Sequence, residues 1–96
     1  MEVGAVSDID ELDSIQKAIL VSLCSKTKGS KGAHLPKPHF MNKPQIQGRK
    51  ADRALRELIG LGYIKVHPTG GETTYELNDR GFEVCREIRE QRKRPL

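Results

Sequence analysis

Apolar residues recur at steps of three and four near the beginning of the chain, the spacing of one face of an α-helix. The positions that follow this spacing are Ile9, Leu12, Ile15, Ile19 and Leu23. Ser7 stands before this run and Asp10 follows three residues later, a spacing close to that of a capping box. We therefore predict a helix over about residues 8–26 that ends before Gly29.

The next segment, residues 27–46, has no clear periodicity and is interrupted by glycines and prolines. Pro36 suits the first position of a helix, where its missing N–H is not needed, whereas Pro38 disfavours helical geometry at the residue before it. We therefore expect a short, irregular helix of one or two turns. Its contacts with the core would be Leu35, Phe40 and Met41. Residues 27–34 have almost nothing apolar to bury, and we expect them to be mobile in the free protein.

A stronger helical pattern covers about residues 46–60. Its apolar positions are Ala51, Leu55, Leu58 and Leu61, which is the spacing of an amphipathic helix. At about 100° per residue, Arg49, Arg53 and Arg56 project from the opposite side of this helix. Gly62 suits the left-handed conformation that commonly ends a helix.

After this glycine the pattern changes to that of a β-hairpin. Residues 63–66 and 73–77 are rich in strand-forming residues, and residues 68–71 between them have the composition of a turn. A two-stranded hairpin is not stable alone in water, so it must pack against the helices.

Asn78 can cap a last helix. The apolar positions of that helix are Phe82, Cys85 and Ile88. We expect the chain to be a single domain of 96 residues whose ends, residues 1–7 and 92–96, are frayed. The order of helix, short irregular helix, helix, two-stranded hairpin and helix predicts a mainly α fold with a small antiparallel hairpin, the winged helix-turn-helix arrangement.

The uneven distribution of charge adds a candidate partner. The net charge is +4, yet residues 1–13 hold acids and no Lys or Arg. In residues 26–53 the only acid is Asp52, and the bases are Lys26, Lys28, Lys31, Lys37, Lys43, Arg49, Lys50 and Arg53. A basic window of this kind is often only a solvated surface. Its concentration beside an acidic flank favours an anionic partner.

Other classes of function lack their characteristic residues. Cys24 and Cys85 lie in apolar helical patterns, where we expect them to pack as small hydrophobes rather than to bridge. No His or Cys pair has zinc-ligand spacing. No nucleophile has a recognisable base, and Gly29–Gly32 lacks the strand that precedes a phosphate-binding loop. We therefore expect no catalysis, no metal or cofactor, and no small-molecule substrate. With no apolar run of membrane-spanning length, we expect a soluble, cytoplasmic protein.

Two motifs carry a family resemblance. Leu55, Leu58, Gly62, Tyr63 and Ile64 form the first, and Tyr75, Leu77, Asn78 and Gly81 form the second, after the hairpin. Together they resemble small prokaryotic winged helix-turn-helix transcriptional regulators of the MarR and PadR kind. The resemblance covers roughly residues 46–90. The departure is residues 27–46, where those families have an ordinary second helix and this chain has three prolines.

The resemblance implies duplex DNA binding, with the helix around residues 46–60 in the major groove and the hairpin of residues 63–77 as a wing. On that helix Arg49 and Arg53 are placed to meet guanine edges or phosphates, and Arg56 a phosphate. The other candidate DNA-binding residues are Gln45, Gln47 and Lys50 near the helix, Lys65, His67, Thr69 and Thr73 in the wing, and Lys28, Lys31, Lys37 and Lys43 in the basic segment.

Two further expectations concern partners. Winged helices also serve as protein-interaction or RNA-binding modules, and fold alone does not distinguish these uses. The three arginines on one face favour nucleic acid over a protein partner. We also expect a homodimer, because Val84 falls off the apolar stripe of the last helix with no evident cover, and because two-fold dimers match palindromic sites in the families that the chain resembles.

Overall fold

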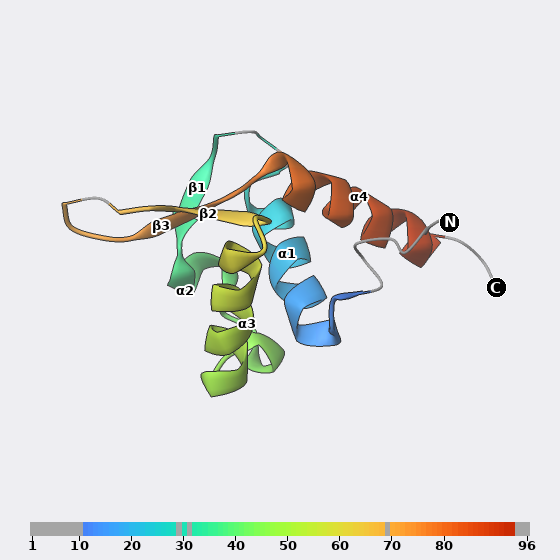
Figure 1. Cartoon of the computed structure of the whole chain (residues 1–96), viewed down its shortest axis with the longest axis horizontal. Helices are drawn as coiled ribbons and strands as arrows, with labels where there is room; N and C mark the ends of the chain where they lie inside the picture. Colours follow the sequence, from blue (N-terminus) through green and yellow to red (C-terminus); the bar gives the residue numbers. More distant parts are fainter. Residues whose placement is uncertain (1–10, 29, 31, 69, 94–96) are drawn as a thin grey trace.

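The computed structural model describes residues 11–28, 30, 32–68 and 70–93. Its elements in chain order are helix α1 (Ser14–Lys26), strand β1 (His34–Pro36), helix α2 (Lys37–Phe40), the 3₁₀ helix η2 (Pro44–Ile46), helix α3 (Arg49–Gly60), strands β2 (Ile64–His67) and β3 (Thr74–Leu77), and helix α4 (Asp79–Lys93). Helix α1 lies at the centre of the molecule, with α3 and α4 against it, and the β2–β3 hairpin projects beyond the helices (Figure 1).

Helix α1 begins later than the apolar spacing predicts. Its N-cap is Asp13, whose side chain accepts a hydrogen bond of 2.8 Å from the backbone N–H of Gln16. The Gln16 side chain in turn accepts one of 2.9 Å from the backbone N–H of Asp13, which completes a capping box. The predicted start is therefore wrong for residues 11–13, and the predicted cap at residues 7–10 lies outside the described residues. The predicted end at Lys26 is confirmed.

The proline-containing segment holds more structure than the sequence indicates. Helix α2 is a single turn, so the short helix is confirmed, but it begins at Lys37 with Pro36 as its N-cap, one residue later than predicted. Phe40 and Met41 are buried in the core and Leu35 packs partly against it. The hydroxyl of Ser22 on α1 donates a 2.5 Å hydrogen bond to the carbonyl of Phe40, which fixes α2 against α1. The mobility expected for residues 27–34 stays a prediction, and residues 29 and 31 lie outside the described residues.

The sheet has three antiparallel strands in the order β1–β3–β2, and the sequence pattern does not predict one of them, β1. The hairpin itself is confirmed, with Ile64 opposite Leu77 and His67 opposite Thr74. Strand β1 pairs with the other side of β3 and ends at Pro36. Proline is tolerated there because β1 is an edge strand. The predicted class, mainly α with a small antiparallel sheet, is confirmed.

The two sequence motifs meet at one junction between α3, the hairpin and α4. Gly62 has a φ of 87°, and the N–H of Tyr63 reaches back to the carbonyl of Leu58 at 3.0 Å, so α3 ends in a Schellman turn. The Asn78 side chain donates to the carbonyl of Gly62 at 2.9 Å. A Cβ on Gly81 would lie 2.4 Å from the carbonyl oxygen of Tyr63, so only glycine lets α4 begin this close to β2.

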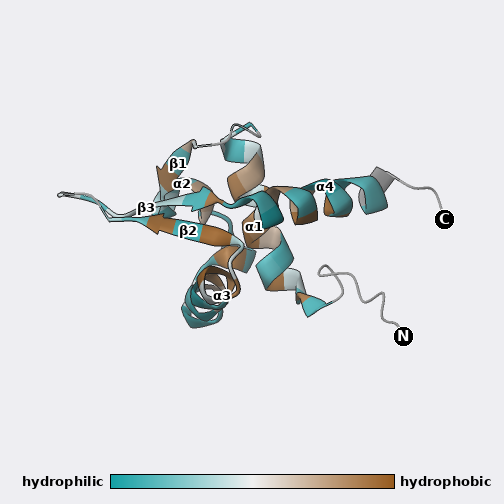
Figure 2. Cartoon of the chain, turned by 45° about the horizontal axis from the view of Figure 1, so that its top comes forward, coloured by the Kyte–Doolittle hydropathy of each residue, from teal (hydrophilic) through white to brown (hydrophobic). Residues whose placement is uncertain are grey.

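The core forms where α1, α3, α4 and the sheet meet. The largest fully buried side chains are Phe40, Ile19, Leu20, Leu23, Ile46, Leu58, Ile64, Val84 and Cys85. Helix α3 shows a hydrophobic side toward this core and a hydrophilic side away from it (Figure 2). Because Val84 is covered within the single chain, it gives no reason for a dimer, and that step of the sequence argument is wrong.

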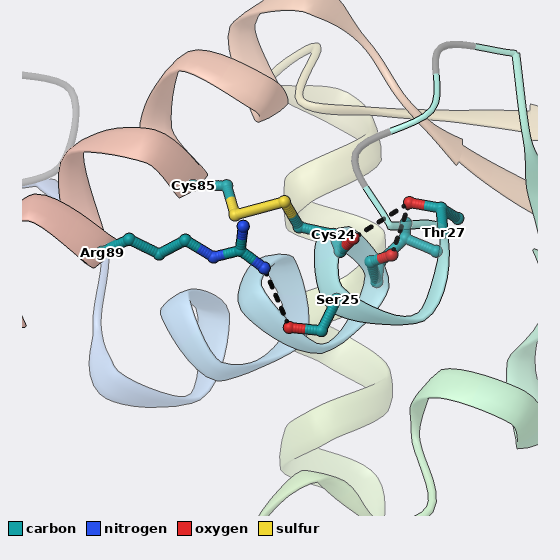
Figure 3. Close-up of a disulfide and its surroundings, with 6 residues drawn as sticks. Cys24, Ser25, Thr27, Cys85 and Arg89 are labelled. Atoms are coloured by element: carbon teal, nitrogen blue, oxygen red, sulfur yellow. Dashed lines mark hydrogen bonds between the residues drawn. A yellow bond between two sulfur atoms is a disulfide. The ribbon is translucent and has the colours of Figure 1, made fainter.

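The two cysteines form a disulfide, so the prediction that they would pack without bridging is wrong. Cys24 of α1 and Cys85 of α4 are buried, with their Cα atoms 6.7 Å apart (Figure 3). Beside the bridge, the Arg89 guanidinium donates a 3.1 Å hydrogen bond to the hydroxyl of Ser25. The bridge and this hydrogen bond both join the end of α1 to the middle of α4.

Candidate nucleic-acid interface

The outward face of α3 carries the three arginines that the helical periodicity places on one side. Arg49, Arg53 and Arg56 are exposed, whereas the buried residues on the opposite side are Ala51, Ala54, Leu55 and Leu58. At 100° per residue the three arginines fall within about 60° of one another around the helix axis. We call the exposed face formed by Arg49, Arg53 and Arg56 the arginine surface.

The two acids of α3 lie on its flanks. Asp52 forms an ion pair with Lys37 at the start of α2. On the other flank, the Glu57 carboxylate accepts a hydrogen bond of 3.1 Å from the side-chain amide of Gln16 on α1. Neither acid pairs with an arginine of the surface. Within the described part of the chain, no carboxylate lies within ion-pair distance of the three guanidinium groups. The three guanidinium groups of the arginine surface are therefore not held in ion pairs with described residues, and the surface carries net positive charge.

Lys50, Gln47, Lys43 and Gln45 are all exposed. Lys50 lies on the flank of α3, and Gln47 precedes the helix in extended backbone. Lys43 and Gln45, from the start of η2, line a cavity of about 460 Å³ together with Lys26 and Ser25 of α1. The structure thus groups these two residues with α1, where the sequence groups them with α3.

In the hairpin, two of the four candidate residues, Lys65 and His67, have Glu76 of the neighbouring strand as a partner. Lys65 is exposed and lies opposite Glu76 in the β2–β3 register. The ring nitrogen Nε2 of His67 is paired with the carboxylate of that same Glu76. The ring of His34 on β1 lies 4.9 Å from the ring of His67. Thr73 is exposed, and Thr69 lies outside the described residues.

The carboxylate of Glu76 interacts with both bases of this part of the sheet, Lys65 and His67. The hydrogen bond from His67 holds the pKa of the Glu76 carboxyl below its usual value. Partial desolvation opposes this shift, and the positive field of His67 and Lys65 and a backbone hydrogen bond from Gly32 add to it. A carboxylate held in its charged form compensates the bases on either side of it. The wing is therefore less positive than its own Lys and His residues indicate.

In the basic segment, Lys28 and Lys37 have different surroundings. Lys28 is exposed and has a φ of 55°, a left-handed conformation at the turn after α1. Lys37 is half-buried in its ion pair with Asp52. Lys31 lies outside the described residues. Of the predicted lysines in this segment, Lys37 is the one that the structure places beside α3.

Sequence reasoning missed the partners of two acids, the pairing of Asp52 with Lys37 and that of Glu76 with His67. A hairpin centred on residues 68–71 would place Thr74 across from Lys65, so the observed pairing of Lys65 with Glu76 depends on a register that the sequence did not indicate. The pairing of Asp52 with Lys37 had no signal either, since the irregular segment between them does not fix their relative positions.

Two other features are absent from the described residues. No group of three or more His, Cys, Asp or Glu side chains in the described residues is arranged to hold a metal ion. None of the helices in the described ranges has the length and apolar character needed to cross a bilayer.

Comparisons with known proteins bear on the fold. No protein-family model and no curated protein sequence matches the chain. Among solved structures, the fold is similar to that of the type III plasmid segregation protein TubR, with a TM-score of 0.67 and 17% sequence identity. The match covers 94% of this chain and 93% of that chain. The helices and the three-stranded antiparallel sheet therefore form a winged-helix-like fold over nearly the whole chain.

Proposed function

We propose that this protein binds double-stranded DNA, with α3 in the major groove and the β2–β3 hairpin as a wing. The observation that carries the proposal is the arginine surface, on which Arg49, Arg53 and Arg56 project together while both acids of α3 lie on its flanks. Guanidinium groups suit this role because their planar forks match both phosphates and the guanine edge. The fold shared with TubR, a plasmid segregation protein, supports the proposal.

The biological role of the proposed DNA binding is a separate question. The motif resemblance to MarR and PadR regulators supports transcriptional regulation in the cytoplasm, which we propose as the role. The likeness to TubR makes plasmid segregation a second candidate. Deleting the gene distinguishes them, because a regulator changes transcript levels of other genes whereas a segregation protein changes the retention of its plasmid.

The test of DNA binding is a titration at several salt concentrations against duplex, single-stranded DNA and RNA of equal length. We expect the duplex to bind most tightly, with affinity falling by about 0.9 log units per phosphate contact for each log unit of salt. The double variant Arg49→Glu with Arg53→Glu should lose duplex binding. It should remain folded, because both side chains are exposed.

A matched control is Lys17→Glu with Arg86→Glu, which changes the net charge equally on α1 and α4. This pair should lose far less affinity, since it leaves the arginine surface intact. A folded Arg49→Glu, Arg53→Glu variant that binds duplex like the wild type would refute the proposal and move the partner surface elsewhere. Preference for RNA, or binding to neither nucleic acid, would favour the RNA-binding or protein-interaction alternative.

A homodimer remains part of the proposal, although Val84 no longer supports it. What supports it is the motif resemblance, since two-fold dimers match palindromic sites. Sedimentation equilibrium at micromolar concentration should give twice the 10.8 kDa mass of the chain. The mass of a single chain would refute the dimer and leave DNA binding untouched.

A further inference from the structure

A cleft borders the arginine surface on the side of the sheet. Its volume is about 290 Å³, and it is lined by Lys37, Asp52, Leu55, Arg56, Ile59 and Tyr75. One side chain of the arginine surface, Arg56, therefore also faces this cleft. Lys37, the first residue of α2, also lines the cleft. Two bases from different elements thus converge on one hollow with apolar walls.

The acid that lines the cleft, Asp52, already has an ion-pair partner. Asp52 pairs with Lys37, and the side chains of the two residues are 42% and 41% exposed. An ion pair this exposed is weak in water, because solvent and salt screen it. An anion that entered the cleft could therefore replace Asp52 as the partner of Lys37 with only a small loss of free energy. The exposed edge of the cleft, beside Arg56, is where such an anion would enter.

We propose that this cleft is the seat of one DNA backbone phosphate, held by Arg56 and Lys37, and that Asp52 competes with that phosphate for Lys37. The inference rests on the proposed DNA binding and adds a specific phosphate seat to it. The apolar walls formed by Leu55, Ile59 and Tyr75 suit the sugar that accompanies a phosphate. In the free protein Asp52 neutralises Lys37, and in the complex the phosphate does so.

The other acid of α3 provides a control that is matched in charge. Glu57 accepts a hydrogen bond from the neutral amide of Gln16, so it holds no base away from the DNA. Asp52→Asn and Glu57→Gln each remove one negative charge from the same helix and keep the shape of the side chain. Any general effect of net charge on affinity is therefore equal in the two variants. Only Asp52→Asn releases Lys37.

We expect Asp52→Asn to raise duplex affinity about three- to tenfold at 0.1 M salt, and to steepen the salt dependence by up to about 0.9 log units per log unit of salt. Glu57→Gln should change affinity by less than about twofold. Lys37→Ala should weaken binding, and Lys37→Ala combined with Asp52→Asn should lose the gain of the single variant. Circular dichroism checks that each variant is folded, because an acid in the first turn also stabilises the helix.

A scan of single methylphosphonate substitutions locates the phosphate. Neutralising the phosphate that occupies the cleft should weaken the wild type and Asp52→Asn most, and should weaken Lys37→Ala less, because Arg56 alone still contacts it there. Equal gains in Asp52→Asn and Glu57→Gln, or identical scans for the wild type and Lys37→Ala, would overturn the inference. If Arg49→Glu with Arg53→Glu still abolishes binding in that case, the proposed function stands and only the phosphate seat is lost.

Discussion

Helix α3 and the β2–β3 hairpin both carry bases, but the acids of the two regions have different kinds of partner. On α3, the acids Asp52 and Glu57 are bonded to residues outside the helix, so the arginine surface keeps its charge. In the hairpin, Glu76 lies opposite Lys65 and is bonded to His67, so the bases flank their own counter-charge. The same residue types thus give a strongly positive helix face and a nearly balanced wing.

The difference shows that a count of bases does not measure the field that a ligand meets. What matters is where the acids lie, because opposite charges a few ångströms apart cancel at the distance of a partner. On α3, Asp52 and Glu57 each lie one helical turn from an arginine, yet each is bonded to a residue of another element. On a hairpin, an acid and a base at paired positions share one face and neutralise each other.

The largest expected effect tests whether these two regions belong to one folding unit. Helix α3 packs on α1, and the hairpin runs directly into α4, while the Cys24–Cys85 bridge joins α1 to α4. Its cysteines are 61 residues apart in the sequence, so replacing both with Ala should lower the free energy of unfolding by about 4 kcal/mol. Urea denaturation of both proteins measures this difference.

Hydrogen exchange resolved by residue tests the shared unit more directly. In the Cys24→Ala, Cys85→Ala variant, amides of α3 and of the β2–β3 ladder should lose protection together. Reductant should weaken the wild type to the level of this variant and leave the variant unchanged. Protection lost in the hairpin alone would show that α3 does not depend on the bridge, and the two regions would then be separate units.

The parts of the fold that sequence predicts are those with local signals. Gly62 ends α3, and the strand-forming runs on either side of residues 68–71 give the hairpin, because both depend on neighbouring residues. Gly81 belongs to a motif whose physical reason appears only in the structure, namely the approach of α4 to the carbonyl of Tyr63. Family resemblance captured that requirement without explaining it.

The parts that sequence missed depend on contacts between distant residues. Strand β1 has only three residues and contains a proline, so it has too few positions to show alternation. The bridge joins cysteines of two different helices, and spacing alone cannot pair them. The start of α1 was placed too early because Ser7 and Asp10 have capping-box spacing similar to that of the pair observed in the structure, Asp13 and Gln16. For the site, the arginine face was predictable from periodicity, and the partners of the bases were not.

A smaller effect separates the arginine surface from the wing on the preferred DNA site. Arg53→Ala should weaken binding there by about 1–3 kcal/mol if Arg53 contacts a base, whereas Lys65→Ala should cost less than about 0.5 kcal/mol because Glu76 already offsets that lysine. Arg56→Ala should weaken all sequences alike and lower the salt slope by about one unit. Titrations against the preferred and a scrambled duplex measure these losses. A Lys65→Ala loss equal to that of Arg53→Ala would show that the wing is not balanced.

The smallest expected effect comes from replacing Glu76, which should leave the bases of the wing without their counter-charge. Glu76→Gln takes away the counter-charge of Lys65 and the hydrogen-bond partner of His67, so duplex affinity should rise modestly.

The stability of the folded protein should respond in the opposite direction. The pKa of Glu76 is lowered in the folded protein, so its contribution is fully present above the usual value of 4.5 and is lost as the pH falls through the lowered value. Because the site is partly exposed, that contribution is at most about 1 kcal/mol. Urea denaturation at pH 7 should therefore show Glu76→Gln slightly less stable than the wild type, and the gap should close in acid below this range. A gap that stayed constant with pH would mean that the stability of the wing does not depend on the charge of Glu76, and the account of a balanced wing would then fail.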